Sequence, residues 1–78
     1  MIRVTNCGWY YGNGAEIEDA VLDALVWFGK RYGERANFVQ LCKEDRERLD
    51  GRIRGLTVLE REMCVERGNF MVGRIERV

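Results

Sequence analysis

The pattern of apolar and polar positions predicts one amphipathic helix over residues 13–33. Its apolar positions recur at helical spacing and occupy an arc of roughly 160° on a helical wheel, which is the width of a core-facing stripe. Asn13 and Glu16 have the spacing of a capping box at the start of this helix. Gly33 supplies the left-handed residue that commonly ends a helix. The predicted stripe consists of Ile17, Ala20, Val21, Ala24, Leu25, Trp27, Phe28 and Tyr32.

Two aliphatic residues, Leu22 and Val26, lie one turn apart on the opposite side of the predicted helix. Leaving a large aliphatic side chain in water forgoes about 1.5–3 kcal/mol of burial energy. A partner, such as a second copy of the chain, would recover that energy, and so would the chain's own strands if they wrapped around this side. A third alternative is that the pair stays exposed, as scattered surface aliphatics often do.

Strand patterns flank the helix. Residues 1–6 alternate between apolar and polar side chains with the period of a half-buried strand, and residues 37–43 form a short apolar run typical of a central strand. Together with the helix they predict a strand, helix, strand unit, which crosses over right-handedly if its strands are parallel. Residues 43–51 are highly charged and predict one or two helical turns that end at Gly51.

The C-terminal part of the chain predicts strands again. Residues 56–60 form one alternating stretch, and residues 70–76 form another after a turn at residues 67–69. Residues 63–65 predict a further short strand that pairs with residues 70–72 across this turn. No proline interrupts any of these pairings.

These elements predict a single α+β domain over residues 1–78. We expect a small two-layer fold in which one long helix packs on a mainly antiparallel sheet of about four strands, in the order β-α-β-β-β. A chain of this length buries only about 60% of its unfolded surface, so its own stability is modest. Association with a second copy would bury more apolar surface and add to that stability.

The composition argues against several classes of function. The sequence contains neither His nor Ser, which removes the commonest general base and metal ligand near neutral pH and makes a serine triad impossible. We therefore predict no enzyme activity, no catalytic residue, no metal site and no cofactor. The 13 basic and 13 acidic residues balance to zero formal charge, which disfavours nucleic-acid binding.

Cysteine spacing and the apolar runs bear on the compartment. Cys7, Cys42 and Cys64 lie too far apart for a CxxC pair, so we expect all three to be reduced and mostly buried, with Cys42 an inert core residue. The longest apolar run, residues 24–28, is too short to cross a bilayer, and no signal-peptide pattern is present. The prediction is a cytoplasmic protein without a membrane partner.

A glycine-rich segment lies between the first predicted strand and the helix. Gly8, Gly12 and Gly14 have the GxxxGxG spacing, which resembles the motif of short-chain dehydrogenases at the same place in their fold. The resemblance implies a pyrophosphate site at the helix N-terminus. Three aromatic residues among these glycines would crowd such a site, and the chain is too short for the rest of a doubly wound sheet. The simpler interpretation is a glycine-rich connection.

The aromatic residues of this segment, Trp9, Tyr10 and Tyr11, follow one another directly. Neighbouring residues in an extended segment face opposite sides, so at least one of the three rings is expected to be exposed. An exposed Trp or Tyr on a loop is a common recognition anchor. The alternative is that Trp9 and Tyr11 pack on the sheet or helix while Tyr10 lies flat against its own loop.

The sequence favours a non-enzymatic interaction or assembly module that associates with itself or docks on another protein. The predicted interface consists of Leu22, Val26, Trp9, Tyr10 and Tyr11. One alternative is a small-molecule or phosphate-binding domain that uses the segment 8–14 at the helix N-terminus. A second alternative is weak nucleic-acid binding through arginines that would have to share one face, namely Arg46, Arg48, Arg52 and Arg54.

Overall fold

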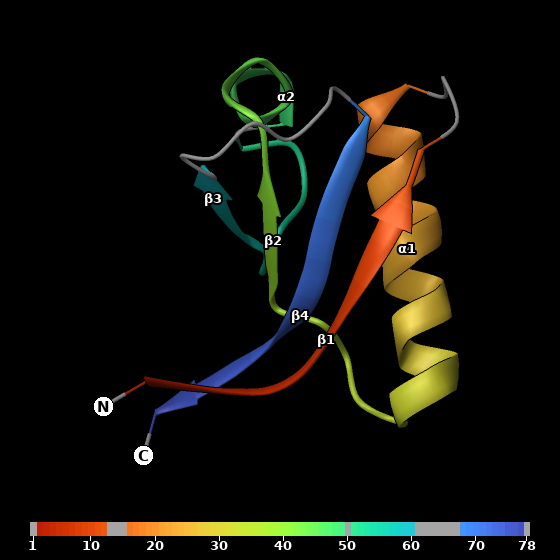
Figure 1. Cartoon of the computed structure of the whole chain (residues 1–78), viewed down its shortest axis with the longest axis vertical. Helices are drawn as coiled ribbons and strands as arrows, with labels where there is room; N and C mark the ends of the chain where they lie inside the picture. Colours follow the sequence, from red (N-terminus) through yellow and green to blue (C-terminus); the bar gives the residue numbers. More distant parts are fainter. Residues whose placement is uncertain (1, 13–15, 50, 61–67, 78) are drawn as a thin grey trace.

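The computed structural model describes residues 2–12, 16–49, 51–60 and 68–77. A four-stranded sheet forms one layer, and the helices pack against it (Figure 1). The predicted α+β class and the element order β-α-β-β-β are confirmed, with the charged segment forming a second, short helix. The elements are β1 (Ile2–Tyr11), α1 (Ile17–Tyr32), β2 (Phe38–Leu41), α2 (Lys43–Leu49), β3 (Thr57–Glu60) and β4 (Asn69–Arg77).

The strand order in the sheet is β1-β4-β2-β3. β4 is antiparallel to both of its neighbours, β1 and β2, whereas β2 and β3 are parallel. β1 and β2 therefore run in the same direction, with β4 between them. The predicted strand, helix, strand unit is thus parallel, but the last strand of the chain separates its two strands.

The predicted pairing of residues 63–65 with residues 70–72 is wrong. Phe70 pairs with Tyr10 of β1 on one side and with Leu41 of β2 on the other, and the same two strands flank the next two residues of β4. Both edges of this part of β4 are therefore occupied. Residues 63–65 themselves lie outside the described residues.

β1 extends farther than the sequence predicted. It continues to Tyr11, so the predicted loop after residue 6 is wrong. The register with β4 is unbroken over residues 6–11, and the Gly12 N–H continues the pairing by donating to the Gly68 carbonyl at 2.8 Å. Gly8 is accommodated within the strand because the ring of Trp27 takes the place of a side chain: a Cβ there would lie 2.6 Å from Trp27 Cη2.

α1 begins later than predicted and ends where predicted. Its first residue is Ile17, and Glu16 before it has an extended ψ of 137° and makes no side-chain capping bond. The predicted capping box is therefore wrong, and Asn13 lies outside the described residues. At the other end Gly33 has a left-handed φ of 69°, and its N–H donates to the Gly29 carbonyl at 2.9 Å.

The hydrophobic core lies between α1 and the sheet face that it covers. Most of the predicted helical stripe is buried there, and Leu25 and Tyr32 pack against its margin, whereas Trp27 stays partly exposed. α2 contacts β2, β3 and α1 and adds Leu49 to the core. The largest fully buried side chains are those of Phe28, Phe70, Leu41, Leu49, Val21, Val39 and Val72.

Candidate interaction surfaces

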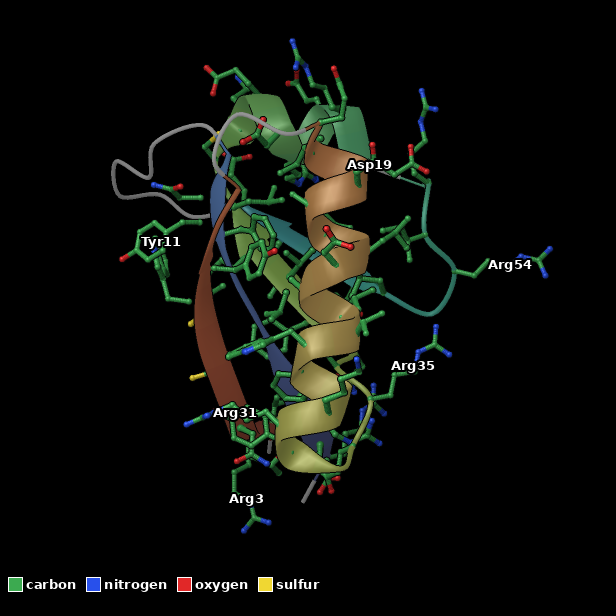
Figure 2. All side chains as sticks on the ribbon, turned by 90° about the vertical axis from the view of Figure 1, so that its right-hand side faces the viewer. Arg3, Tyr11, Asp19, Arg31, Arg35 and Arg54 are labelled. Carbon is green, nitrogen blue, oxygen red and sulfur yellow. The ribbon has the colours of Figure 1, made fainter. Side chains whose placement is uncertain are left out.

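One face of the sheet is turned away from α1, and we call it the outer face. Gly8 lies against Trp27 of α1, so the side chains on either side of Gly8 in β1 point to the opposite face. By this alternation Trp9 and Tyr11 stand on the outer face, and Figure 2 shows Tyr11 projecting from β1 away from α1. Tyr10 points inward, and its ring lies 5.3 Å from that of Phe70.

The outer face is apolar over much of its width. Registers between neighbouring strands place one row across the whole sheet, and the row consists of Trp9, Met71, Gln40 and Leu59. Trp9 is 37% exposed and Leu59 39% exposed, at opposite edges of the row. Tyr11, beside Trp9, is 61% exposed, and the two rings are 6.2 Å apart in an edge-on arrangement.

Phe38 is a large side chain of the outer face that the described part of the chain buries. It lies opposite Gly73 in the register of β2 with β4, and it is only 3% exposed. Its ring covers Gly73 so closely that a Cβ there would lie 2.6 Å from Phe38 Cε1. The ring therefore lies against the backbone at Gly73, where it is shielded, whereas Trp9 is 37% exposed and Tyr11 61% exposed.

These positions settle the prediction for the three aromatic residues of β1. At least one ring is exposed, as expected, and there are two: Trp9 and Tyr11. The alternative in which Tyr10 lies flat against its own loop is wrong, because Tyr10 belongs to β1 and its ring packs on Phe70. All three belong to a strand and not to a loop.

Leu22 and Val26 are exposed on the side of α1 that faces away from the sheet. Their exposed fractions are 45% and 58%, so the chain's described strands do not cover them. The alternative in which the chain's own strands wrap around this side does not hold for the described strands. Because α1 lies between this pair and the sheet, the pair and the outer face are on opposite sides of the molecule. They cannot form one continuous interface on a single copy.

The glycine segment does not build a phosphate-binding loop in its described part. Gly8 is covered by Trp27, and the Gly12 N–H is already bonded to Gly68. The start of α1 is also acidic, which opposes an anion there. An open hollow of about 500 Å³ adjoins it, lined by Glu16, Ile17, Glu18, Asp19, Arg48 and Arg52.

The four arginines considered for nucleic-acid binding do not share one face. Arg46 lies 3.8 Å from Glu60 of β3, whereas Arg48 and Arg52 line the acidic hollow at the start of α1. Residues two apart on a helix point to nearly opposite sides, which separates Arg46 from Arg48 on α2. Arg54 points away from the body of the protein in Figure 2.

Two cysteines have contrasting environments. Cys42 is buried beside the start of α2, and burial raises the pKa of its thiol above the ordinary value of 9.0; the Asp45 backbone opposes the rise, and the Asp45 carboxylate adds to it. Lys43 therefore does not produce an activated thiolate at Cys42. Cys7 is exposed, so the expectation of mostly buried cysteines is wrong for this residue, and Cys64 lies outside the described residues.

Two polar residues that sequence reasoning missed hold the sheet together. The Asn37 side chain donates to the Ile75 carbonyl at 2.9 Å and accepts from the Ile75 N–H at 2.8 Å, which extends the pairing of β2 with β4. Asp45 is 3% exposed and accepts from the Gly68 N–H at 2.6 Å. Only the register of distant segments reveals these roles, because the sequence shows merely an Asn before a strand and an acidic residue early in a helix.

Comparisons with known proteins gave no match among family models, curated proteins or solved structures. Within residues 2–12, 16–49, 51–60 and 68–77, no cluster of cysteine and acidic side chains could hold a metal ion. Neither of the two described helices has both the length and the apolar character needed to span a bilayer.

Proposed function

We propose that this chain is a non-enzymatic assembly module that associates with copies of itself. The observation that carries the proposal is the outer face, where Trp9, Tyr11 and Leu59 stay exposed while the helices cover only the other side of the sheet. Aromatic residues are the most frequent energetic anchors of protein interfaces, because large rigid rings bury much area at little entropic cost.

The size of the chain supports the same proposal. A domain of 78 residues has a small core, so apolar surface buried between two copies would add a large fraction to its stability. The absence of His and Ser from the sequence removes the usual proton-transfer and nucleophilic groups and supports a non-enzymatic role. An exposed, free Cys7 fits a reducing compartment such as the cytoplasm.

The two alternatives have weaker support. Phosphate binding by the segment 8–14 would need free backbone N–H groups, and Gly12 donates to Gly68. Nucleic-acid binding would need a joint basic surface, and Arg46, Arg48 and Arg52 lie on separate sides of α2 or beside acidic residues. Self-association needs only the apolar groups that are already exposed.

Light scattering over a range of protein concentrations tests the proposal. The wild type should have at least twice the monomer mass at about 100 µM, and Trp9→Glu combined with Tyr11→Lys should lower the mass to that of a monomer without changing the net charge. The matched control is Leu22→Glu with Val26→Lys, on the side of α1 that faces away from the sheet, and it should keep the wild-type mass. A wild type that stays monomeric at millimolar concentration would overturn the proposal.

A further inference from the structure

β1 forms one edge of the sheet, and its outward backbone groups can be identified. Figure 2 shows no helix or strand beyond β1 on that side of the described structure. Antiparallel residues alternate between facing their partner strand and facing away from it. Because the Gly12 N–H bonds to β4, the backbone groups of Tyr11 and Cys7 point outward. The Tyr32 hydroxyl, which donates to the Cys7 carbonyl at 3.4 Å, agrees with this direction.

The outward edge of β1 lacks the usual features that prevent strand addition. Proteins protect exposed edges with Lys, Pro, bulges or inward-pointing charges. Residues 7–11 contain no charged residue and no proline, and the irregularity of β1 lies earlier, between Val4 and Asn6. A strand with matching donors and acceptors can therefore pair with this part of β1, where the Cys7 carbonyl would accept from the added strand alongside, or in place of, the Tyr32 hydroxyl.

α1 carries complementary charges along the flank that overhangs this edge. Trp27 marks the flank, because its ring lies over Gly8 of β1. Asp23 lies one turn before Trp27 and Lys30 about one turn after it on the same flank, and both are exposed. Neither takes part in an ion pair within the described part of the chain. Along the helix, this flank therefore presents the acidic Asp23, the aromatic Trp27 and the basic Lys30 in that order.

We propose that a second copy of this chain adds to the edge of β1 in antiparallel orientation, around a two-fold axis close to Gly8 and Trp9. Two four-stranded sheets then become one continuous sheet. The same axis places Trp27 beside Trp27 of the partner subunit and Asp23 beside the partner's Lys30, and the reciprocal ion pair follows from the symmetry. With the axis at Trp9, the two Trp9 side chains meet on the outer face, and each Tyr11 lies opposite Cys7 and diagonal to Trp9 of the other copy.

This geometry rests on the proposed self-association and specifies how it occurs. Leu22 and Val26 face away from the sheet, so they stay outside an interface formed along the edge of β1. The variant Leu22→Glu with Val26→Lys should therefore dimerise like the wild type, within about threefold in Kd. A dimer lost in this variant, but kept in the edge variants below, would overturn edge pairing while leaving self-association intact.

The backbone part of the proposal is tested with Cys7→Pro, and Cys7→Ala is the matched control. The Cys7 N–H points away from β4, so proline leaves the internal ladder intact and removes only an outward donor, twice in the symmetric dimer. Sedimentation equilibrium should give a Kd raised about tenfold or more for Cys7→Pro and nearly unchanged for Cys7→Ala. Equal constants for the two variants would overturn the pairing.

Charge reversal tests the helix flank independently. Asp23→Lys and Lys30→Asp should each weaken the dimer severalfold, because each places like charges together across the axis. The double variant should recover most of the loss, since Lys at 23 again faces Asp at 30 of the other copy. A double variant weaker than both single variants would overturn the proposed orientation.

Amide hydrogen exchange of the wild type covers the case in which Cys7→Pro fails to fold. The N–H groups of Cys7 and Tyr11 should become protected as protein concentration rises through the Kd. Exchange of these two amides that does not depend on concentration, in a sample that is dimeric by light scattering, would overturn edge pairing. A wild type that is monomeric throughout would overturn both this geometry and the proposed function.

Discussion

The two faces of the same sheet carry apolar residues but differ in how they are covered. On the face beneath α1, Phe70, Val72 and Val39 are fully buried. On the outer face, Trp9 is 37% exposed and Tyr11 61% exposed, and along β1 they alternate with Gly8 and Tyr10, which face the core. A sheet that met water on its second face would normally carry polar side chains there. The outer face departs from this pattern, because it carries exposed aromatic and aliphatic side chains.

The largest expected effect is a difference in the free energy of unfolding lost when a side chain is truncated on each face of the sheet. Phe70→Ala should lower the free energy of unfolding by about 3–5 kcal/mol, because it leaves a cavity between Tyr10 and the core. Leu59→Ala on the outer face should cost distinctly less, since the side chain is 39% exposed at the sheet edge. Chemical denaturation at low protein concentration measures both.

Similar losses for Phe70→Ala and Leu59→Ala would contradict the distinction between the faces. It would mean that Leu59 contributes as much to the folded chain as a fully buried ring. The comparison must be made below the association range, because a dimer would add the interface energy to the apparent stability.

The second prediction concerns Gly73 on the outer face, which the Phe38 ring covers. Gly73→Ala should destabilise the protein by about 1–3 kcal/mol, because the new Cβ would lie 2.6 Å from Phe38 Cε1 and 2.6 Å from the Asn6 carbonyl oxygen. Thermal unfolding followed by circular dichroism measures the change.

Gly29→Ala is the matched control, because a Cβ at this helical position meets nothing within 4 Å. It should stabilise α1 by about 0.5–1 kcal/mol through the better helix propensity of alanine. If both alanine variants stabilise the protein, the Phe38 ring does not cover Gly73.

Local periodicity accounts for the parts of the fold that the sequence predicted. Val21 and Phe28 belong to a stripe whose helical spacing requires no knowledge of distant contacts, and Gly33 ends the helix by a property of its own backbone. The apolar run around Val39 likewise indicates a buried strand. For the candidate site, the same periodicity correctly placed Leu22 and Val26 on the exposed side of α1.

Register over long sequence separations accounts for the parts that the sequence did not predict. Gly8 and Gly12 look like loop residues locally, whereas pairing with β4, some sixty residues away, makes β1 continuous through this segment. Gly8 is small because Trp27 occupies the space above it. The outer-face row from Trp9 to Leu59 depends on three pairings at once, so no single stretch of sequence contains it.

The third prediction concerns the side chain of Cys42, which is buried, in contrast to the exposed Cys7. Burial raises the pKa of its thiol above 9.0, so the folded state disfavours the thiolate relative to the unfolded state. Its contribution to stability is complete below about pH 9 and is lost as the pH rises through the folded-state pKa. The wild type should therefore lose more stability between pH 8 and pH 10 than Cys42→Ala does.

Thermal unfolding at both pH values, for both proteins, gives this difference directly. Other groups titrate in the same range, but they do so equally in the wild type and in Cys42→Ala and cancel in the comparison. A wild type whose pH dependence equals that of the variant would show that burial of Cys42 does not couple to its ionisation.

The smallest expected effect comes from two neighbouring tyrosines on opposite faces. Tyr11→Thr should change the stability of the dilute monomer by less than about 0.5 kcal/mol, because the side chain is mostly solvated and threonine suits a strand. Tyr10→Thr should cost distinctly more, since it removes a ring packed on Phe70. The concentration dependence of Tm separates the two tyrosines in a second way. The wild-type Tm should rise with protein concentration, and Tyr11→Thr should lose most of that rise. If the Tm of Tyr11→Thr rises with concentration as much as that of the wild type, Tyr11 on the outer face contributes nothing to association.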